Sequence, residues 1–389
     1  MMEKSSAFPP TNPRLAQVQA CFANFFSIAN LGDTNSAYRG KPIWTNYQTD
    51  DICQPVMKLL IEVPASRDAV LYFISNLIHE NVHLHLSEQE RKDASKSVDY
   101  SSLQRAVLRL LTNLNTFRVE YSDKKMSFSI SLLKMLFELF SELFRKNCQR
   151  PFFTHQPPPP ALFLSEFQQI QCVSELFALL DSTFASLMQI RPESAVFAFV
   201  SAHKSFFANF DWVAIHIAET FPSIVVHLVR VGAEEFCAHC NEMLNPAVRL
   251  NAAHVVQLQD EYSTRQNVLR LFTEVFLYME RKRKLELRAC FMSIVEKFLR
   301  TGDNWRELLF LIKLSLFSPT VTLPFMDELL PHIIQHPFLA DRLHELAANP
   351  ALSIAVSPTN FLQNFLRKMV ENASTEHVFD LAKIVSTFL

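Results

Sequence analysis

Residues 126–147 read MSFSISLLKMLFELFSELFRKN, and this stretch decides the fold class. Its large apolar residues recur every three or four positions, the spacing that places side chains on one face of an α-helix. Two adjacent stripes result: Leu132, Leu136, Leu139 and Leu143 in one, and Leu133, Phe137, Phe140 and Phe144 in the other. An apolar face this wide predicts a long helix that packs against two neighbours.

The same spacing recurs on both sides of this stretch. It predicts two earlier helices with the stripes Val70, Phe73, Ile74, Leu77 and Ile78, then Leu103, Val107, Leu110 and Leu114. Further helices are predicted over residues 13–30, 162–189, 192–204, 210–243, 304–317, 323–335, 338–348 and 359–387. Helix pairs that follow one another at about 40 residues are typical of HEAT and armadillo repeats. We therefore expect an all-α fold, an α-solenoid of degenerate HEAT/armadillo-like helix pairs.

Glycine is scarce, and its scarcity bears on function. The chain has four glycines, and none stands in a GxGxxG, GxxxxGK(S/T) or GxSxG pattern. Phosphate loops and nucleophile elbows need glycine because their backbones adopt positive φ or approach a ligand closely. The composition therefore disfavours nucleotide-binding domains, α/β-hydrolases and all-β folds. We expect no catalytic residues, no cofactor and no small-molecule substrate.

Composition divides the chain into four segments. Residues 1–12 are expected to be a disordered tail, and residues 13–148 an N-terminal helical array. Residues 149–161 contain the run QPPPP, which cannot continue a helix and predicts a Pro-rich linker or loop. These prolines form either a stiff spacer, which we favour, or a ligand for an SH3-type domain. Residues 162–389 are expected to form a second helical array, continuous with the first as one solenoid.

The net charge and the cysteine content indicate which surfaces the chain can bind and the redox state of its compartment. A formal net charge of -2 gives no general attraction to nucleic acid or to acidic membranes. The N-terminus, MMEKSSAFPP, lacks the apolar core of a signal peptide, and the seven cysteines are an odd number. A reducing compartment with free, buried thiols is expected. The most apolar stretch, residues 308–317, is about half the length that a membrane span requires.

One set of residues suggests a metal site. It consists of the run CAHC with a nearby histidine, and of a separate HxxxHxH run: Cys237, His239, Cys240 and His227, then His79, His83 and His85. A structural zinc ion needs four nitrogen or sulfur ligands, so each run alone is half a site. The favoured interpretation is a pair of thiols on a half-buried helix and a polar histidine face, so we assign no metal ligand.

Two further features have both a structural and a functional interpretation. The basic run ERKRKLELR, residues 280–288, is typical of a solvated link between helices, with a nuclear import signal as the alternative. Trp212 at the start of an amphipathic helix is interpreted as core, with a partner-binding hot spot as the alternative. No nucleophilic triad can be assembled from the serines and histidines.

The most distinctive run is FDWVAIHIAETFPSIVVHLVRVGAEEFC, residues 210–237. It resembles the N-terminal region of the Integrator complex subunit 5 family in the order and spacing of Phe210 to Val213, His216-Ile217, Phe221-Pro222, Gly232 and Phe236-Cys237. Collinear similarity extends over about residues 50–335. It includes Leu59-Leu60, Pro64, Arg67, Ala69 to Leu71, Val82 and His85-Leu86 early in the chain, and Phe310-Leu311, Ser318-Pro319 and Asp327 to Leu329 later.

This resemblance implies a function. The Integrator is a nuclear assembly attached to RNA polymerase II that cleaves nascent RNA, including the 3′ ends of small nuclear RNAs, and carries a protein phosphatase. Subunit 5 would be a helical scaffold that pairs with subunit 8 and helps to link the phosphatase module to the core. Family members are usually longer than this chain, which stops at Leu389, so we expect either a fragment of a longer protein or a chain that lacks the C-terminal half.

The leading hypothesis is therefore a non-catalytic α-solenoid subunit of the nuclear Integrator complex, acting in small nuclear RNA 3′-end processing and transcription regulation. Its expected partners are other Integrator subunits, subunit 8 first and the phosphatase module indirectly, with no direct nucleic-acid site and no membrane. A generic HEAT-type adaptor, for example in nuclear transport, is the first alternative. A metal-dependent hydrolase that uses the CAHC run and the 79–85 histidines is the minor one.

Elemental analysis of the purified chain tests the hydrolase hypothesis. We expect substoichiometric zinc, because neither half-site closes a tetrahedral ligand set by itself. Dialysis against a chelator should leave the thermal unfolding curve unchanged. One zinc ion per chain that survives gel filtration would overturn this expectation.

Overall fold

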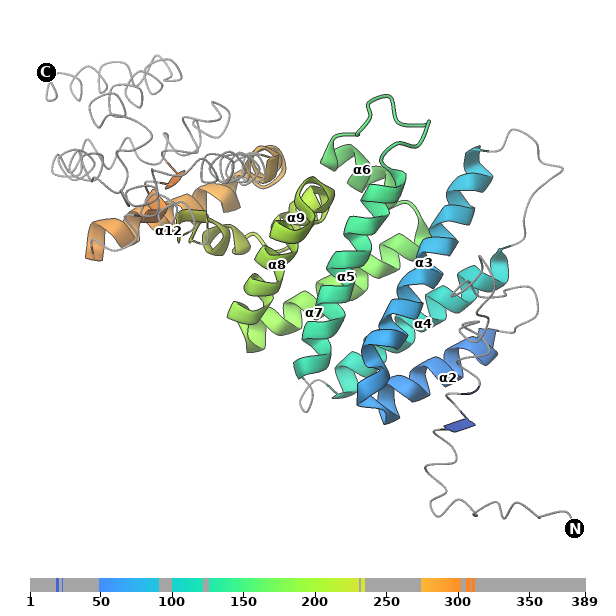
Figure 1. The fold of residues 1–389 in the computed structure, drawn as a ribbon. Helices are drawn as coiled ribbons and strands as arrows, with labels where there is room; N and C mark the ends of the chain where they lie inside the picture. Colours follow the sequence, from blue (N-terminus) through green and yellow to red (C-terminus); the bar gives the residue numbers. More distant parts are fainter. Residues whose placement is uncertain are drawn as a thin grey trace, which may run out of the picture. The chain divides into compact units, whose positions relative to one another are not determined.

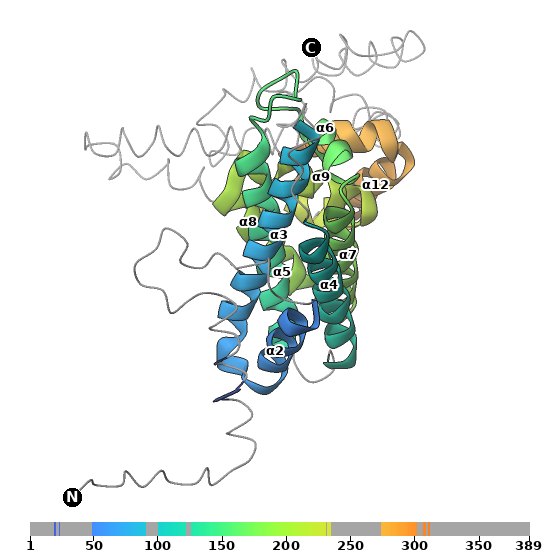
Figure 2. The same ribbon diagram turned by 90° about the vertical axis from the view of Figure 1, so that its right-hand side faces the viewer.

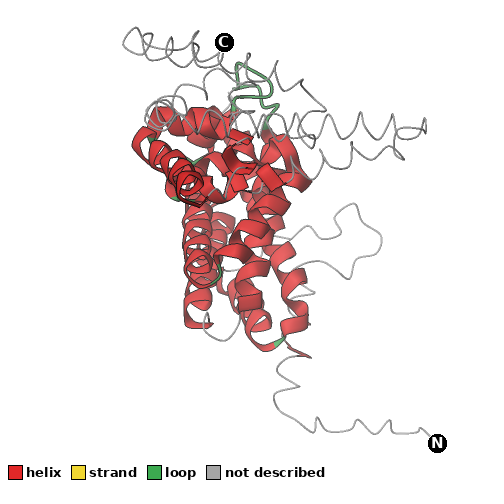
Figure 3. Cartoon of the chain, turned by 90° about the vertical axis from the view of Figure 1, so that its left-hand side faces the viewer, coloured by secondary structure: helices red, strands yellow, loops and turns green. Residues whose placement is uncertain are grey.

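The computed structural model of the chain describes residues 49–90, 100–121, 126–230, 232–234 and 274–301, with residues 19, 20, 23, 306–308, 310 and 311. All regular elements among these residues are helical, as Figure 3 shows, so the predicted all-α class is confirmed for the described part of the chain. The chain divides into two compact units, Met1–Ala198 and Phe199–Leu389, and each is described here by itself.

Six labelled helices lie entirely within the described residues of the first unit, which holds most of the described residues (Figure 1). They are α2 (Thr49–Glu62), α3 (Arg67–Glu90), α4 (Ser101–Tyr121), α5 (Met126–Asn147), α6 (Pro160–Phe167) and α7 (Gln171–Ile190). A 3-10 turn, Pro64–Ser66, joins α2 to α3, and α8 (Pro192–Phe206) crosses from the first unit into the second. The stretch between α5 and α6 contains the prolines, so the predicted Pro-rich segment lies within the first unit.

The first unit is built from two layers of helices. α4 packs between α2 and α7 in one layer, while α3 packs beside α5 in the other. The layers meet where α3 packs on α4 and α5 on α7, and Figure 2 shows α4 and α7 on one side with α3 and α5 on the other. This arrangement buries an apolar face of every helix without any strand in the described residues.

Side-chain contacts establish the direction of the helices within a layer. The Gln104 amide donates to Gln171 at 3.2 Å, and the Ser182 hydroxyl donates to Asn115 at 3.0 Å. Both contacts join residues that are 67 positions apart, so α4 and α7 run parallel. The Cys53 thiol on α2 reaches the Ala106 carbonyl on α4 at 3.6 Å, which ties the third helix of that layer to its neighbour.

The core of the first unit is centred on α5, as its sequence predicts. All eight residues of its two apolar stripes are at most 5% exposed. The Phe140 ring contacts Phe177 of α7 with a centroid separation of 4.4 Å, and Phe144 contacts Phe163 of α6 at 4.6 Å. The stripes predicted for α3 and α4 are buried as well. Helical spacing therefore identified the buried faces of three helices correctly.

One predicted helix is broken. The single helix expected over residues 162–189 is two helices, α6 and α7, which meet at a bend of 109°. Phe163 and Ile170 are buried, and in an unbroken helix this stripe would continue at Ser174. Ser174 is exposed and Val173 is buried instead, so the buried face changes direction at this point. The extended backbone of Ile170 makes the turn that lets both faces reach the core.

The described part of the second unit is also helical. It consists of a 3-10 turn, Phe207–Phe210, followed by α9 (Asp211–Thr220), helical residues 224–230 and 274–282, and α12 (Lys284–Thr301). Residues 224–229, a run rich in β-branched side chains within the stretch predicted to be helical over 210–243, are helical. Trp212 is fully buried, which confirms its interpretation as a core residue. Gly232, part of the resemblance above, is itself helical and buried.

Several expectations fall outside the described residues. They concern most or all of the predicted helices at 13–30, 304–317, 323–335, 338–348 and 359–387, and the end of the one predicted over 210–243. Among the described pairs, α2, α4 and α7 begin at Thr49, Ser101 and Gln171. This spacing is wider than the predicted 40 residues, because α3 and α5 are 24 and 22 residues long and α6 is inserted before α7.

We compared the described helices with the requirements of a membrane span. No single one of them is both long enough and apolar enough to cross a bilayer. α6 and α7 meet both criteria only when they are taken together across their bend.

Truncating one aromatic side chain of α5 tests the core. Phe140→Ala should lower the free energy of unfolding by about 3–5 kcal/mol, because it removes a buried ring that the surrounding helices cannot replace. Tyr72→Ala is the matched control, since Tyr72 on α3 is 70% exposed and should change stability by less than about 0.5 kcal/mol. Urea denaturation followed by circular dichroism measures both, and equal effects would contradict the packing described here.

Candidate functional site

The predicted histidine run lies on α3, where each ring has its own surroundings. His79 faces α5, His83 faces the start of the α5–α6 connection, and His85 faces Tyr100 just before α4. The run therefore does not converge on one point. Among the described residues no group of three His, Cys, Asp or Glu side chains lies close enough together to hold a metal ion. Cys237, His239 and Cys240 lie outside the described residues, and His227 is half-buried.

His79 is the most perturbed of the three histidines. Burial lowers its pKa from 6.5 to about 4, and the positive charge of Lys146 on α5 adds to this effect. Glu142 acts in the opposite direction but is engaged by Arg145 at 2.6 Å and by Lys146 at 3.3 Å. The imidazole is therefore neutral at physiological pH and fills space between α3 and α5.

His83 takes part in the strongest polar contact between α3 and the α5–α6 connection. The Arg150 guanidinium forms an ion pair with Glu90 at 2.8 Å and donates to Nδ1 of His83 at 3.0 Å. The arginine side chain is only 13% exposed and that of Glu90 26%, so this ion pair is partly shielded from solvent. It holds the C-terminal end of α3 against the residues that follow α5.

His85 borders a cavity of the first unit. Its Nδ1 lies 2.9 Å from the Tyr100 hydroxyl, and its Nε2 lies 3.1 Å from the Gln89 amide nitrogen. Burial lowers the pKa of His85, which favours the neutral ring. With Gln89 donating to Nε2, the proton of the ring lies on Nδ1 and is donated to Tyr100.

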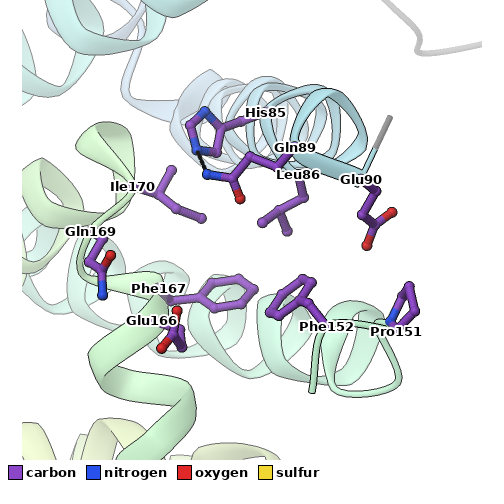
Figure 4. Close-up of a pocket in the computed structure, with 10 residues that line it drawn as sticks. All are labelled: His85, Leu86, Gln89, Glu90, Pro151, Phe152, Glu166, Phe167, Gln169 and Ile170. Atoms are coloured by element: carbon purple, nitrogen blue, oxygen red, sulfur yellow. Dashed lines mark hydrogen bonds between the residues drawn. The ribbon is translucent and has the colours of Figure 1, made fainter. Parts of the chain in front are cut away.

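The cavity has a volume of about 510 Å³ and draws on three segments. Figure 4 shows the end of α3 on one side, the residues after α5 on another, and the corner between α6 and α7 on the third. Its lining combines apolar and polar side chains: Leu86, Pro151, Phe152, Phe167 and Ile170 with His85, Gln89, Glu90, Glu166 and Gln169. Sequence analysis considered only His85 among these residues as a possible ligand, and Pro151 and Phe152 lie more than 60 positions after it in the chain.

A row of aromatic rings supports this cavity from below. Phe152 contacts Phe153 at 4.4 Å, Phe153 contacts Phe163 at 5.6 Å, and Phe163 stacks on Phe167 at 3.9 Å. Phe163 and Phe167 are fully buried, whereas Phe152 at the edge is 42% exposed. The row links the connection after α5 to α6, so the wall of the cavity is part of the hydrophobic core.

A second cavity of about 560 Å³ is lined by residues of α3 and α5. Exposed Tyr72 stands at its edge, and His79 and Met135 form part of its floor. Its charges are mixed, with Lys134 and Lys146 near acidic residues of both helices. No single chemistry dominates this cavity.

The cysteines that the structure describes do not form a reactive site. Cys53, Cys172 and Cys290 are buried, Cys148 is half-buried, and none of these four forms a disulfide. Burial raises the pKa of Cys172 to about 12 and that of Cys290 to about 11, so both remain thiols rather than nucleophilic thiolates at neutral pH. Burial also raises the pKa of Cys148.

In the second unit, two described polar contacts join segments that are far apart in the sequence, and one of them is donation from the Cys290 thiol to the Pro222 carbonyl at 3.5 Å. The Tyr278 hydroxyl donates to Glu219 at the end of α9 at 2.6 Å, and burial raises the pKa of this tyrosine. The basic run lies at the start of α12, where Arg283 pairs with Glu286 at 2.9 Å and Lys284 with Glu280 at 3.0 Å. These pairs are typical of a solvated link between helices.

A family model described as the Integrator complex subunit 5 N-terminus matches residues 36–238, which is more than half of the chain. The chain belongs to the Integrator complex subunit 5 family. The match includes α2 to α9 and the whole of the 210–237 run on which the resemblance was based. Both cavities of this Integrator subunit 5 family member lie within the matched residues. No curated protein matches the chain.

The lowered pKa of His79 predicts a pH dependence of stability. In the unfolded chain the ring takes up a proton near pH 6.5, whereas in the folded chain it does so only near pH 4. Stability is therefore fully present above pH 6.5 and should fall by up to about 3 kcal/mol as the pH drops to 4. His79→Gln should flatten this part of the profile, measured as Tm against pH.

His155→Gln is the matched control for that measurement. His155 is exposed in the connection between α5 and α6, so its substitution should leave the profile unchanged. A profile that is equally steep in wild-type protein and in the His79 variant would show that other groups cause the loss of stability.

Proposed function

We propose that this chain is a non-catalytic scaffold subunit of the nuclear Integrator complex. The observation that carries the proposal is the family match over residues 36–238, which includes all the labelled helices from α2 to α9. The named family is that of subunit 5 of this complex. A subunit of this complex assembles with the other Integrator subunits, so we include that assembly in the proposal.

The packing of the first unit supports a scaffold built as an α-solenoid. In a solenoid, antiparallel helix pairs stack so that equivalent helices of successive pairs lie side by side and run parallel. α4 and α7 have this relation, with the same separation of 67 residues at two contacts. We propose that α2 with α3, α4 with α5, and α7 with α8 are successive degenerate HEAT-like pairs.

The side chains that the structure describes support a binding role over a catalytic one. The three histidines of α3 are occupied by separate contacts, and the buried cysteines are held as thiols. Solenoids bind partners through extended surfaces and need no reactive group. We assign subunit 8 as the first partner, with the phosphatase module reached indirectly.

The biological setting follows from the assembly. The proposed role is structural support for the 3′-end processing of small nuclear RNAs and for the regulation of transcription by RNA polymerase II. Both processes take place in the nucleus, so nuclear localisation is part of the proposal. The four segments at 1–12, 13–148, 149–161 and 162–389 remain its proposed domain organisation.

Affinity purification tests this proposal. The natural full-length protein, tagged at its own locus, should recover the other Integrator subunits from nuclear extract in amounts close to its own. Mass spectrometry measures the recovery, and untagged cells are the control. Recovery of the tagged chain without Integrator subunits would overturn the proposal. Recovery of the complex with no enrichment of subunit 8 would overturn only that partner assignment.

A further inference from the structure

The cavity beside His85 has the composition of a binding site for one particular kind of side chain. Its apolar lining and its polar lining face the same space in Figure 4. Phe152 and Phe167 present rings from the lower side, and Leu86 and Ile170 lie opposite them. Leu86, Phe167 and Ile170 are at most 5% exposed, so the exposed Phe152 is the aromatic ring that a ligand can reach.

Phe152 is placed to bind rather than only to pack. It is 42% exposed, while the neighbouring Phe153 is only 5% exposed and holds it by a ring contact at 4.4 Å. The Arg150–Glu90 ion pair, one residue before Pro151, fixes the segment against α3. The exposed ring is thus held on a rigid support, which lowers the entropic cost of binding.

The polar groups of the cavity are mainly hydrogen-bond acceptors. The Gln89 amide nitrogen is directed to His85, so its oxygen faces the cavity, as Figure 4 shows. Glu166 carries a carboxylate on the rim, and no cation pairs with it among the residues that the structure describes. Glu90 is neutralised by Arg150. The cavity therefore has an excess of negative charge and of acceptors.

A guanidinium group satisfies these conditions together. It is planar, stacks on aromatic rings, carries a permanent positive charge and donates five hydrogen bonds in a fixed plane. A lysine ammonium has the charge but not the plane, and an uncharged apolar group would leave the carboxylate unpaired. Charge complementarity with Glu166 and the aromatic face of Phe152 both favour arginine.

We propose that this cavity binds an arginine side chain carried by a segment of another protein subunit. The guanidinium stacks on Phe152 and donates to the Glu166 carboxylate and to the Gln89 oxygen. The inference rests on the proposed function only for the source of the arginine, which is another subunit of the same assembly. The binding chemistry itself follows from the lining residues.

Direct binding is measured with three fluorescein-labelled heptapeptides, GSLRFSG and its counterparts with lysine or citrulline in place of arginine. Fluorescence anisotropy with the full chain should show that the arginine peptide binds about tenfold more tightly than the citrulline peptide. The lysine peptide should fall between them. Equal affinities for all three peptides, or no binding of the arginine peptide at about millimolar concentration, would overturn the proposal.

Variants of the chain identify the site. Glu166→Gln should weaken the arginine peptide by about three- to tenfold and leave the citrulline peptide unaffected, because it removes only the charge. Phe152→Leu keeps the apolar volume and should weaken binding by a few-fold through loss of the aromatic face. Glu193→Gln, on exposed α8 surface away from the cavity, is the matched control and should bind like wild type. Unchanged binding in Glu166→Gln would overturn the site.

A charge-reversing substitution at Glu166 in the full-length protein separates this inference from the proposed function. Glu166→Lys reverses the charge of an exposed residue and should leave the melting temperature unchanged, while reducing recovery of one Integrator subunit at least several-fold. Full recovery by the variant would overturn the role of the cavity and leave the proposed function standing. If the wild-type protein recovers no Integrator subunit, the proposed function is overturned. The peptide measurements would still show whether the cavity binds arginine.

Discussion

The burial of both apolar stripes of α5 is the constraint on which the first unit depends. A helix with two adjacent stripes has to be covered from two directions, by α3 within its own layer and by α7 across the layers. The contact between Phe140 and Phe177 is one point where the layers meet. Because α7 is also the parallel neighbour of α4, covering α5 orders both layers together.

The cavity beside His85 is a consequence of how the chain returns to this core. After α5 the chain leaves that layer and enters the other layer as α7, and α6 with its bend of 109° makes this connection. The aromatic row from Phe152 to Phe167 anchors the return to the core. The short α6 does not fill the space above the end of α3, so a cavity with rigid walls remains. Residues that line the cavity therefore also stabilise the fold.

The spacing of apolar residues predicted the features that depend only on the geometry of a single helix. The spacing of Leu132, Leu136, Phe137 and Phe140 requires a helix, because only a period near 3.6 residues brings these side chains to one face. Trp212 could be assigned to the core for the same reason, and its full burial confirms this. The break at Ile170 was missed because both sides of it are apolar with helical spacing. Only the direction of the buried face, set by the neighbouring helices, distinguishes two helices from one.

By itself, the sequence determined the all-α class, the buried faces of α3, α4 and α5, and the family. The class and the buried faces follow from periodicity, and the family follows from the order of residues in the 210–237 run. Both observations can be made without knowing the long-range contacts. The tertiary structure alone decided that the three histidines of α3 point to separate partners, and that Gln89, Phe152 and Glu166 share a cavity. Gln89 and Phe152 are more than 60 positions apart, and no periodic signal links them. Their proximity depends on the two-layer packing and on the bend between α6 and α7.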